Sequence, residues 1–212
     1  MAGDGCGSGE SITNERKEVL DPFLEAFNLL DISPKLDLQD DNFRIINCGG
    51  KTFYYLMHNL FEFSYLKKSN NLLMPKIVEV SDNLFVSEFI SGYFDCDAYV
   101  SDRNIEISSA SEEMINKLQF VLLNFGILSN KFKKLNKKYS KYYNYLTIAG
   151  YEDYKKFYEN IGFKISYKKT LLKKLIAKGV SNRKTDIIPI ENRNIKDLRV
   201  KLGLQQNLGN FW

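Results

Sequence analysis

The sequence contains little histidine, cysteine or proline, and these shortages argue against several classes of protein. It has one histidine, three cysteines and four prolines in 212 residues. The cysteines, Cys6, Cys48 and Cys96, are odd in number and far apart, and no Cys-x-x-Cys pair occurs. We therefore expect neither a disulfide framework nor a zinc site, and this cysteine usage predicts a reducing, cytoplasmic environment.

Long apolar runs and a basic, apolar leader are also missing. Residues 1–11, MAGDGCGSGES, have neither feature, so we expect no secretory signal. The longest apolar run, at 120–128, is interrupted by Asn124 and is too short to span a bilayer, so we expect no membrane segment. The glycine-rich start does not match a phosphate-binding P-loop, because Glu10 stands where that motif requires lysine.

The net charge of +4 is unevenly distributed along the chain. Residues 1–96 carry 8 Lys and Arg against 15 Asp and Glu, whereas residues 97–212 carry 22 against 11. The two parts therefore have formal charges of −7 and +11. We expect a polyanionic partner to bind mainly to the second part, where the lysines cluster.

Two stretches of the chain show the same order of expected elements. Each has an amphipathic helix, two extended segments and a second helix. In the first stretch these lie at 16–32, 34–39, 42–48 and 51–61, and in the second at 111–127, 128–135, 143–149 and 151–161. Ser111 is the expected N-cap of its helix. Similar strings then follow at 61–69 and 162–170. The order predicts a duplicated α+β unit of about 100 residues.

A further helix is expected at 84–97, and its composition is unusual. Ser91 and Gly92 place two small residues where another backbone could approach, and glycine inside a helix is unfavourable without such a reason. The helix then ends on Asp95 and Asp97. Anions at this end oppose the helix dipole and cost stability, which makes them candidates for function.

The segment ISGYFDCDA at 90–98 resembles the nine-residue LAGLIDADG motif of homing endonucleases. Phrases similar to those of the family follow in order, ending with FYENIGF and TDIIPI, and the closest phrases are intein-like, of the dodecapeptide (DOD) type. Two departures are visible. Ala98 replaces the usual final glycine, and the first motif is represented only by residues 2–5, so it is truncated. We expect no self-splicing, because no splicing region precedes Ala2 and the chain ends in LGNFW.

The resemblance implies an α+β fold of two pseudo-symmetric αββαββα units with saddle-shaped antiparallel sheets. The expected divisions are a first repeat at 1–83, a second repeat at 84–190 and a C-terminal tail at 191–212. In the family the two motif helices pack together. With the first cut short, the apolar face of helix 84–97 lacks its expected partner, and we expect self-association through it.

The resemblance also implies metal-dependent cleavage of double-stranded DNA. Asp97 corresponds to the metal-binding acid of the second motif and Asp4 to that of the first. Mg²⁺ is the expected cofactor, because only hard oxygen ligands are offered. A lysine beside each site is expected from the pairs Lys67–Lys68 and Lys168–Lys169, and we assign Lys68 and Lys168 as catalytic. Surface lysine pairs without function remain an equal alternative.

The DNA contact is expected from residues 131–145, which carry six lysines and five aromatic residues. An antiparallel hairpin there fits the major groove of double-stranded DNA, where lysines contact phosphates and guanines. The expected contacts are Lys131, Lys133, Lys134, Lys137, Lys138 and Lys141.

Three other interpretations stay open. They are a DNA-binding relative that has lost cleavage, an RNA-splicing maturase of the same family, and an unrelated interaction module in which the 84–97 helix only packs.

Overall fold

The computed structural model describes residues 11–39, 42–46, 55, 58–61, 72–137, 140–179 and 201. The chain divides into a unit at Met1–Val180 and a second unit at Ser181–Trp212, of which only Lys201 is described. Of the expected elements, most of helix 51–61, the string at 61–69 and the segment TDIIPI lie outside the described residues. No helix in the described part of the chain is long and apolar enough to cross a membrane.

The first sheet has three antiparallel strands and one helix. Its strands are β1 (Ser11–Asn14), β2 (Lys35–Gln39) and β3 (Asn42–Ile46), in the order β1-β3-β2. Helix α1 (Lys17–Leu29) connects β1 to β2. A small core of Ile12, Leu20, Phe27 and Ile45 joins the helix to the sheet. Strand β1 was not anticipated from the sequence, because four residues are too few to show an alternating pattern.

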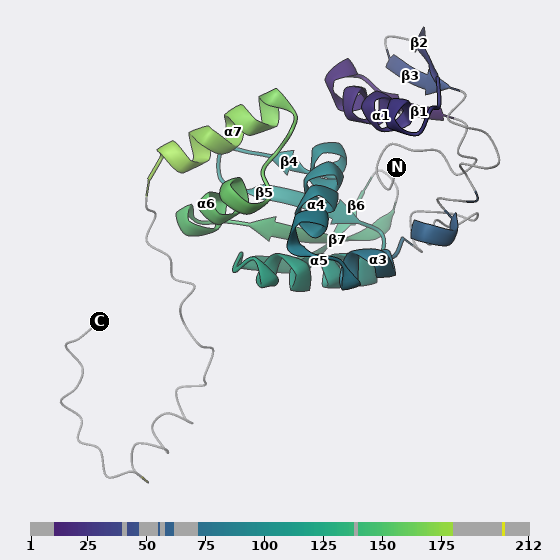
Figure 1. Cartoon of the computed structure of the whole chain (residues 1–212). Coiled ribbons are helices and arrows are strands. Elements are labelled where there is room, and N and C mark those ends of the chain that lie inside the picture. The colour runs from purple at the N-terminus through teal and green to yellow at the C-terminus, as the bar shows by residue number, and fades with distance from the viewer. Residues whose placement is uncertain are drawn as a thin grey trace. The chain divides into compact units, whose positions relative to one another are not determined.

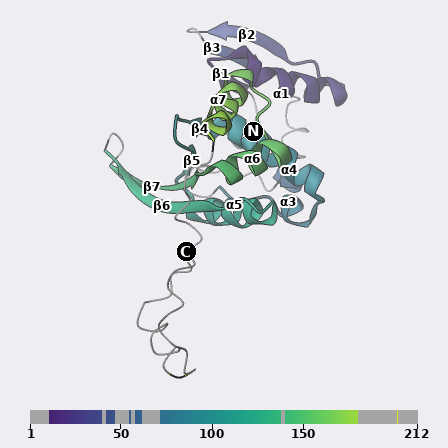
Figure 2. The ribbon, with the colours of Figure 1, turned by 90° about the vertical axis from the view of Figure 1, so that its left-hand side faces the viewer.

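The second sheet has four antiparallel strands. They are β4 (Tyr99–Val100), β5 (Ile105–Ser109), β6 (Ser129–Asn136) and β7 (Lys141–Ile148), in the order β4-β5-β7-β6. Strands β6 and β7 are paired along eight positions each. Figure 2 shows this hairpin extending past the helices.

Five helices accompany this sheet: α3 (Lys76–Val80), α4 (Asn83–Asp97), α5 (Glu112–Asn124), α6 (Tyr151–Asn160) and α7 (Ser166–Ala177) (Figure 1). Their buried apolar side chains meet alternate residues of β5 and β7 in one large core. Ile90 and Phe94 of α4, Leu118 of α5 and Phe157 of α6 are almost completely buried there. The helices therefore cover one face of the sheet, the face that carries Ile105, Ile107, Leu146 and Ile148.

The two sheets share one topology. The series β1-α1-β2-β3 builds a sheet ordered β1-β3-β2, and the series β5-α5-β6-β7 builds one ordered β5-β7-β6. The α+β class with two antiparallel sheets, predicted from the sequence, is therefore confirmed. The second series also has α7, a helix beyond the expected αββαββα unit, in place of the latter part of the string at 162–170.

Helix boundaries follow from their capping residues. Asp82 accepts a hydrogen bond from the Phe85 N–H at 2.8 Å and starts α4 one residue before the predicted position. Ser111 accepts from the Met114 N–H at 3.2 Å, which confirms the predicted N-cap of α5.

Glycines with positive φ end α5 and α6. Gly126 has φ 68° and Gly162 has φ 71°, a conformation that favours glycine. The N–H of Ile127, which follows Gly126, donates to the Leu122 carbonyl at 3.0 Å, and the N–H of Gly162 itself donates to the Phe157 carbonyl at 2.7 Å. The phrases FGI and IGF are therefore helix terminators.

Candidate functional site

The two aspartates at the end of the motif helix α4 have different environments. Asp97 is the last residue of the helix, and its side chain is exposed. Asp95 is only 7% exposed, and its carboxylate accepts hydrogen bonds from the N–H groups of Lys164 (2.9 Å) and Ile165 (3.4 Å). These N–H groups lie at the start of α7, where a carboxylate is favourable. Asp95 therefore joins α4 to α7, and Asp97 is the exposed acid.

The charge state of Asp95 reflects opposing influences. Burial raises the pKa of the Asp95 carboxyl. The N–H groups of Lys164 and Ile165 and the ammonium of Lys168 lower the same pKa. Burial is the largest of these influences, so the pKa of the Asp95 carboxyl lies above its ordinary value although the group is supplied with donors.

Lys168 belongs to the first turn of α7, and its side chain reaches the C-terminal end of α4. It is 3% exposed, and its Nζ donates to the carbonyls of Phe94 (3.0 Å) and Asp95 (2.5 Å). A cation at this end satisfies the last carbonyls and offsets the negative end of the helix dipole. Asp95 and Lys168 thus bond α4 to α7 in both directions, and we call these two residues the helix brace.

The helix brace sets the position of Asp97, which lies two residues after Asp95. A carboxylate at a helix C-terminus is unfavourable by itself, and the Lys168 ammonium offsets part of that unfavourable field. Tyr93, buried one turn earlier, also senses Asp97: burial raises the pKa of the Tyr93 hydroxyl, and the negative charge of Asp97 raises this pKa further.

A magnesium site can be tested only in part. Asp97 offers an exposed carboxylate, and Mg²⁺ is commonly held by one or two carboxylates together with substrate phosphates and water. Within the described ranges, no group of three or more His, Cys, Asp or Glu side chains is arranged to hold a metal by itself. Asp97 therefore fits a site shared with a phosphate. Asp4, Lys67 and Lys68 lie outside the described residues.

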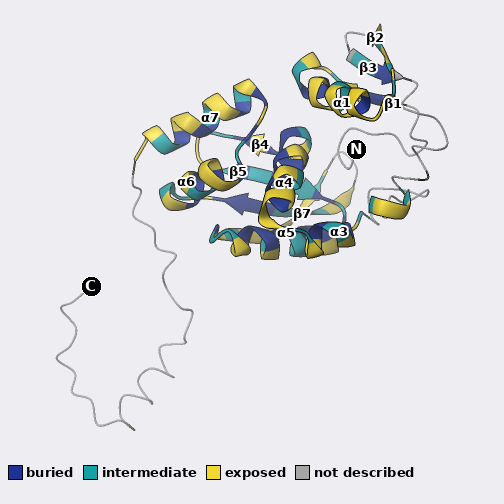
Figure 3. Cartoon of the chain, in the orientation of Figure 1, coloured by how far each residue is buried: buried dark blue, intermediate teal, exposed yellow. Residues whose placement is uncertain are grey.

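The two small residues of the motif helix face different surroundings. The Ser91 side chain is buried, and its Oγ donates to the Gly162 carbonyl at 3.2 Å, so Ser91 packs toward the loop after α6. Gly92 is exposed, and a Cβ added there would meet no atom within 4 Å. Of the two residues, only Gly92 leaves the open space that the sequence predicted at both for the approach of another backbone. Figure 3 shows that α4 carries both exposed and buried faces.

Replacing Gly92 by alanine is expected to raise the free energy of unfolding by about 0.5–1 kcal/mol, because alanine favours the helix and its Cβ has open space. Urea denaturation measures the change. Gly126→Ala is the matched control and should lower stability, because its φ of 68° disfavours alanine. If Gly92→Ala instead lowered the free energy of unfolding, or if that free energy depended on protein concentration, a second backbone would lie against the Gly92 face of α4.

The lysines of the β6–β7 hairpin project from both faces of the sheet. Lys131 and Lys133 pair with the buried residues Leu146 and Asn144 of β7, so they share the helix-covered face. Their ammonium groups contact α5, Lys131 with Asn116 Oδ1 at 2.5 Å and Lys133 with Glu112 Oε2 at 2.7 Å. These two lysines are engaged within the domain.

The opposite face of the second sheet, called here the outer face, is the one that the helices do not cover. Lys134 and Lys141 lie on it, at positions that alternate with Lys131 and Lys133. The other members from β6 and β7 are Asn130, Phe132, Asn136, Tyr143, Tyr145 and Thr147, and the shorter strands add Tyr99, Glu106 and Ser108. Of the remaining predicted lysines, Lys137 is exposed after β6 and Lys138 lies outside the described residues.

Two aromatic rings occupy the middle of the outer face. Phe132 and Tyr145 are direct partners across β6 and β7, with ring centroids 5.2 Å apart and planes inclined by 7°. Phe132 is nonetheless 40% exposed. The outer face therefore combines a rigid apolar centre with amide and ammonium groups on either side.

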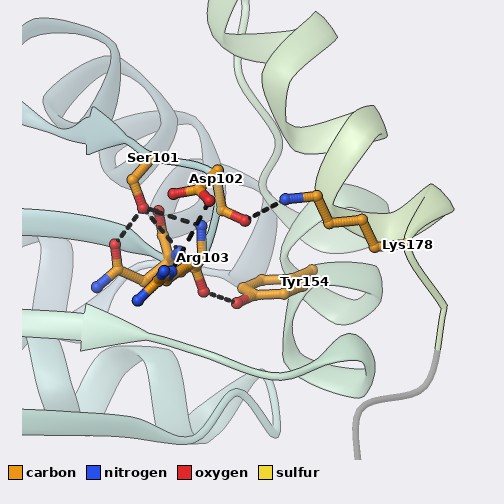
Figure 4. A network of polar contacts seen from close by, with 6 residues as sticks. Ser101, Asp102, Arg103, Tyr154 and Lys178 are labelled. Atoms are coloured by element: carbon orange, nitrogen blue, oxygen red, sulfur yellow. Dashed lines mark hydrogen bonds and ion pairs between the residues drawn. The ribbon is translucent and has the colours of Figure 1, made fainter.

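The turn between β4 and β5 is hydrogen-bonded to α6 and to the residue that follows α7. Ser101 Oγ accepts from the N–H groups of Arg103 (3.1 Å) and Asn104 (3.0 Å). The Tyr154 hydroxyl of α6 donates to the Arg103 carbonyl, and Lys178 Nζ donates to the Asp102 carbonyl at 2.5 Å (Figure 4). One end of the sheet is therefore fixed to α6 and to the end of α7, the helix that also carries Lys168 of the helix brace.

Comparison with known proteins assigns the family. The model of the LAGLIDADG-like domain matches residues 84–162, which include the motif helix and all four strands of the second sheet. Residues 84–162 of this chain therefore belong to the LAGLIDADG-like domain family. The solved structure of I-DmoI in complex with DNA and Mn has the same fold, with a TM-score of 0.52 and 16% identity over 71% of this chain and 78% of that one.

Curated relatives of this chain include longer proteins with unrelated names. The probable translation initiation factor IF-2 of Methanocaldococcus jannaschii is 39% identical over 98% of this chain and 18% of its own length. The replication factor C small subunit of the same organism is 35% identical over 64% of this chain and 7% of its own. The chain thus spans less than a fifth of the length of these relatives.

Proposed function

We propose that this chain is the endonuclease part of an intein. It binds double-stranded DNA in the major groove through the outer face of its second sheet, and it cuts the DNA with a Mg²⁺ ion held by Asp97. The observation that carries the proposal is the combination of that polar, aromatic outer face with a motif helix ending in an exposed carboxylate. The role of an insertion is supported by the relatives. A translation factor and a replication factor share this segment, which occupies a minor part of each.

The dimensions of the hairpin suit the major groove. Eight paired residues in β6 and β7 span about 26 Å, at about 3.3 Å per residue. At about 3.4 Å per base pair, this length covers roughly seven or eight base pairs. A two-stranded ribbon is narrow enough for the groove, where each base pair presents its own donors and acceptors.

The proposed chemistry places one carboxylate at the scissile phosphate. When bound, Mg²⁺ supplies charge neutralisation at the phosphate and an activated water. Asp97 would hold the ion, with Asp4 as its proposed counterpart in the first repeat and Lys68 near that site. For Lys168 we propose positioning rather than contact with phosphate, because its ammonium is already bonded to two helix carbonyls.

Two pairs of lysines test which face of the hairpin lies on DNA. The double variant Lys134→Gln/Lys141→Gln removes two cations from the outer face. The slope of log K against log salt should flatten by at least about 0.9, the value for one phosphate that is no longer neutralised. The matched double variant Lys131→Gln/Lys133→Gln, on the other face of the same hairpin, should leave the slope nearly unchanged. Equal effects of the two pairs, or no slope in the wild type, would contradict the proposed interface.

A DNA-binding protein without cleavage is the second candidate. It uses the same outer face of the second sheet and needs no metal at Asp97. Binding to a selected duplex that leaves both strands intact at millimolar Mg²⁺ would identify it.

A further inference from the structure

We infer that the outer face reads a defined pattern of base pairs, in which the stacked pair Phe132–Tyr145 recognises a thymine methyl group. The inference rests on the proposed binding of DNA by this face and goes further by stating what the face selects.

The spacing of side chains along β6 matches the spacing of base pairs. Residues that share a face of a strand recur about every 6.6 Å, which is close to two base-pair steps of about 3.4 Å. The outer-face residues of β6 are Asn130, Phe132, Lys134 and Asn136. A ribbon lying along the groove therefore presents an amide, an apolar ring, an ammonium and a second amide, at intervals of about two base pairs.

Each of these groups has a preferred partner in the major groove. Asparagine pairs with the two hydrogen-bonding atoms of adenine, lysine donates to guanine, and an apolar side chain contacts the thymine methyl. The order along β6 predicts four contacted base pairs, each two positions from the next. They are an A·T pair, a second A·T pair contacted through its thymine, a G·C pair and a further A·T pair. Because all four side chains lie on β6, a shift of the ribbon along the groove would move the four contacts together.

The ring of Phe132 is suited to a fixed contact. It stacks on Tyr145 at 5.2 Å with nearly parallel planes, so its free orientations are restricted before DNA binds. It is 40% exposed at the centre of the face, between Asn130 and Lys134 on the same strand. A methyl group that meets this ring is removed from water at little cost in side-chain entropy.

The chain contains a matched control for this contact. Leu135 is also an apolar residue of β6, with 43% of its surface exposed, but it pairs with Tyr142 and lies on the opposite face. Phe132→Ser and Leu135→Ser thus remove comparable apolar surface from the two faces of one strand.

The experiment begins with affinity selection from a randomised duplex library by the wild-type chain. Each thymine of the selected sequence is then replaced singly by uracil, which lacks only the methyl group. One replacement should weaken wild-type binding about fourfold, which corresponds to about 0.8 kcal/mol for one apolar carbon. The same replacement should have no effect on Phe132→Ser and should keep its effect on Leu135→Ser. In a second selection, Lys134→Gln should lose the guanine preference two base pairs from that thymine, and the other preferences should remain.

Three outcomes separate this inference from the proposed function. Wild-type binding that tolerates uracil at every position would overturn the thymine contact, even where the two lysine pairs behave as proposed. Equal loss of the uracil effect in Phe132→Ser and Leu135→Ser would also overturn it. Failure of the wild type to bind any duplex would remove the proposed function as well.

Discussion

Asp97→Asn is expected to abolish Mg²⁺-dependent cleavage of a plasmid carrying the selected site and to leave DNA affinity within a few-fold of wild type. Asparagine lacks the charge that holds the metal, whereas the groove contacts come from the outer face of the sheet. The free energy of unfolding should rise by about 0.3–1 kcal/mol, because the change removes an anion from the C-terminus of α4. Plasmid nicking, duplex binding and urea denaturation measure the three quantities.

Asp95→Asn is the control on the same helix end. Its carboxylate is buried and accepts hydrogen bonds from two N–H groups of the α7 segment, so this change should lower stability. Opposite signs for the two aspartates would separate the functional acid from the structural one. Undiminished nicking by Asp97→Asn would refute its assignment as a metal ligand.

Lys168→Met is expected to reduce the free energy of unfolding by about 2 kcal/mol, because two buried carbonyls lose a charged donor. For a domain of this size the melting temperature should fall by about 4–8 °C. Cleavage should fall as well, since the end of α4 that presents Asp97 is released. Thermal melts and nicking rates measure both effects.

The neighbouring Lys169 provides the control for Lys168, because it is exposed and carries the same charge. Lys169→Met should leave the melting temperature within about 1 °C. If Lys168→Met eliminated nicking at unchanged stability, the helix brace would be disproved, and a direct chemical role of the ammonium would be favoured.

Much of the fold could be predicted from the sequence, because local signals agreed with one another. The helix expected at 84–97 is observed at Asn83–Asp97, and the one expected at 111–127 at Glu112–Asn124. In both cases apolar periodicity coincides with an N-capping residue, Asp82 or Ser111. The short strands β1 and β4 have too few residues for such a pattern, and the partner of β1 is β3, which follows only after α1 and β2.

The site was less predictable, because it depends on tertiary contacts. Strand alternation alone places Lys131 and Lys133 on one face and Lys134 on the other, but the sequence does not reveal which face α5 covers. The helix brace joins Asp95 to a lysine 73 residues later, and neither residue type indicates that pairing. The doublet at Lys168 was recognised only by its family resemblance, and its bonds to helix carbonyls emerged from the fold.

The most direct test is to incubate the wild-type chain with a randomised library of duplexes in Mg²⁺ and to sequence the DNA ends that form. The account predicts ends clustered at one recurring sequence. They should be absent without Mg²⁺ and with Asp97→Asn, and strongly reduced with Lys134→Gln/Lys141→Gln. Ends distributed at random, or a recurring cut that persists in both variants, would contradict the assignment of this chain as a site-specific endonuclease acting through Asp97 and the outer face of its second sheet.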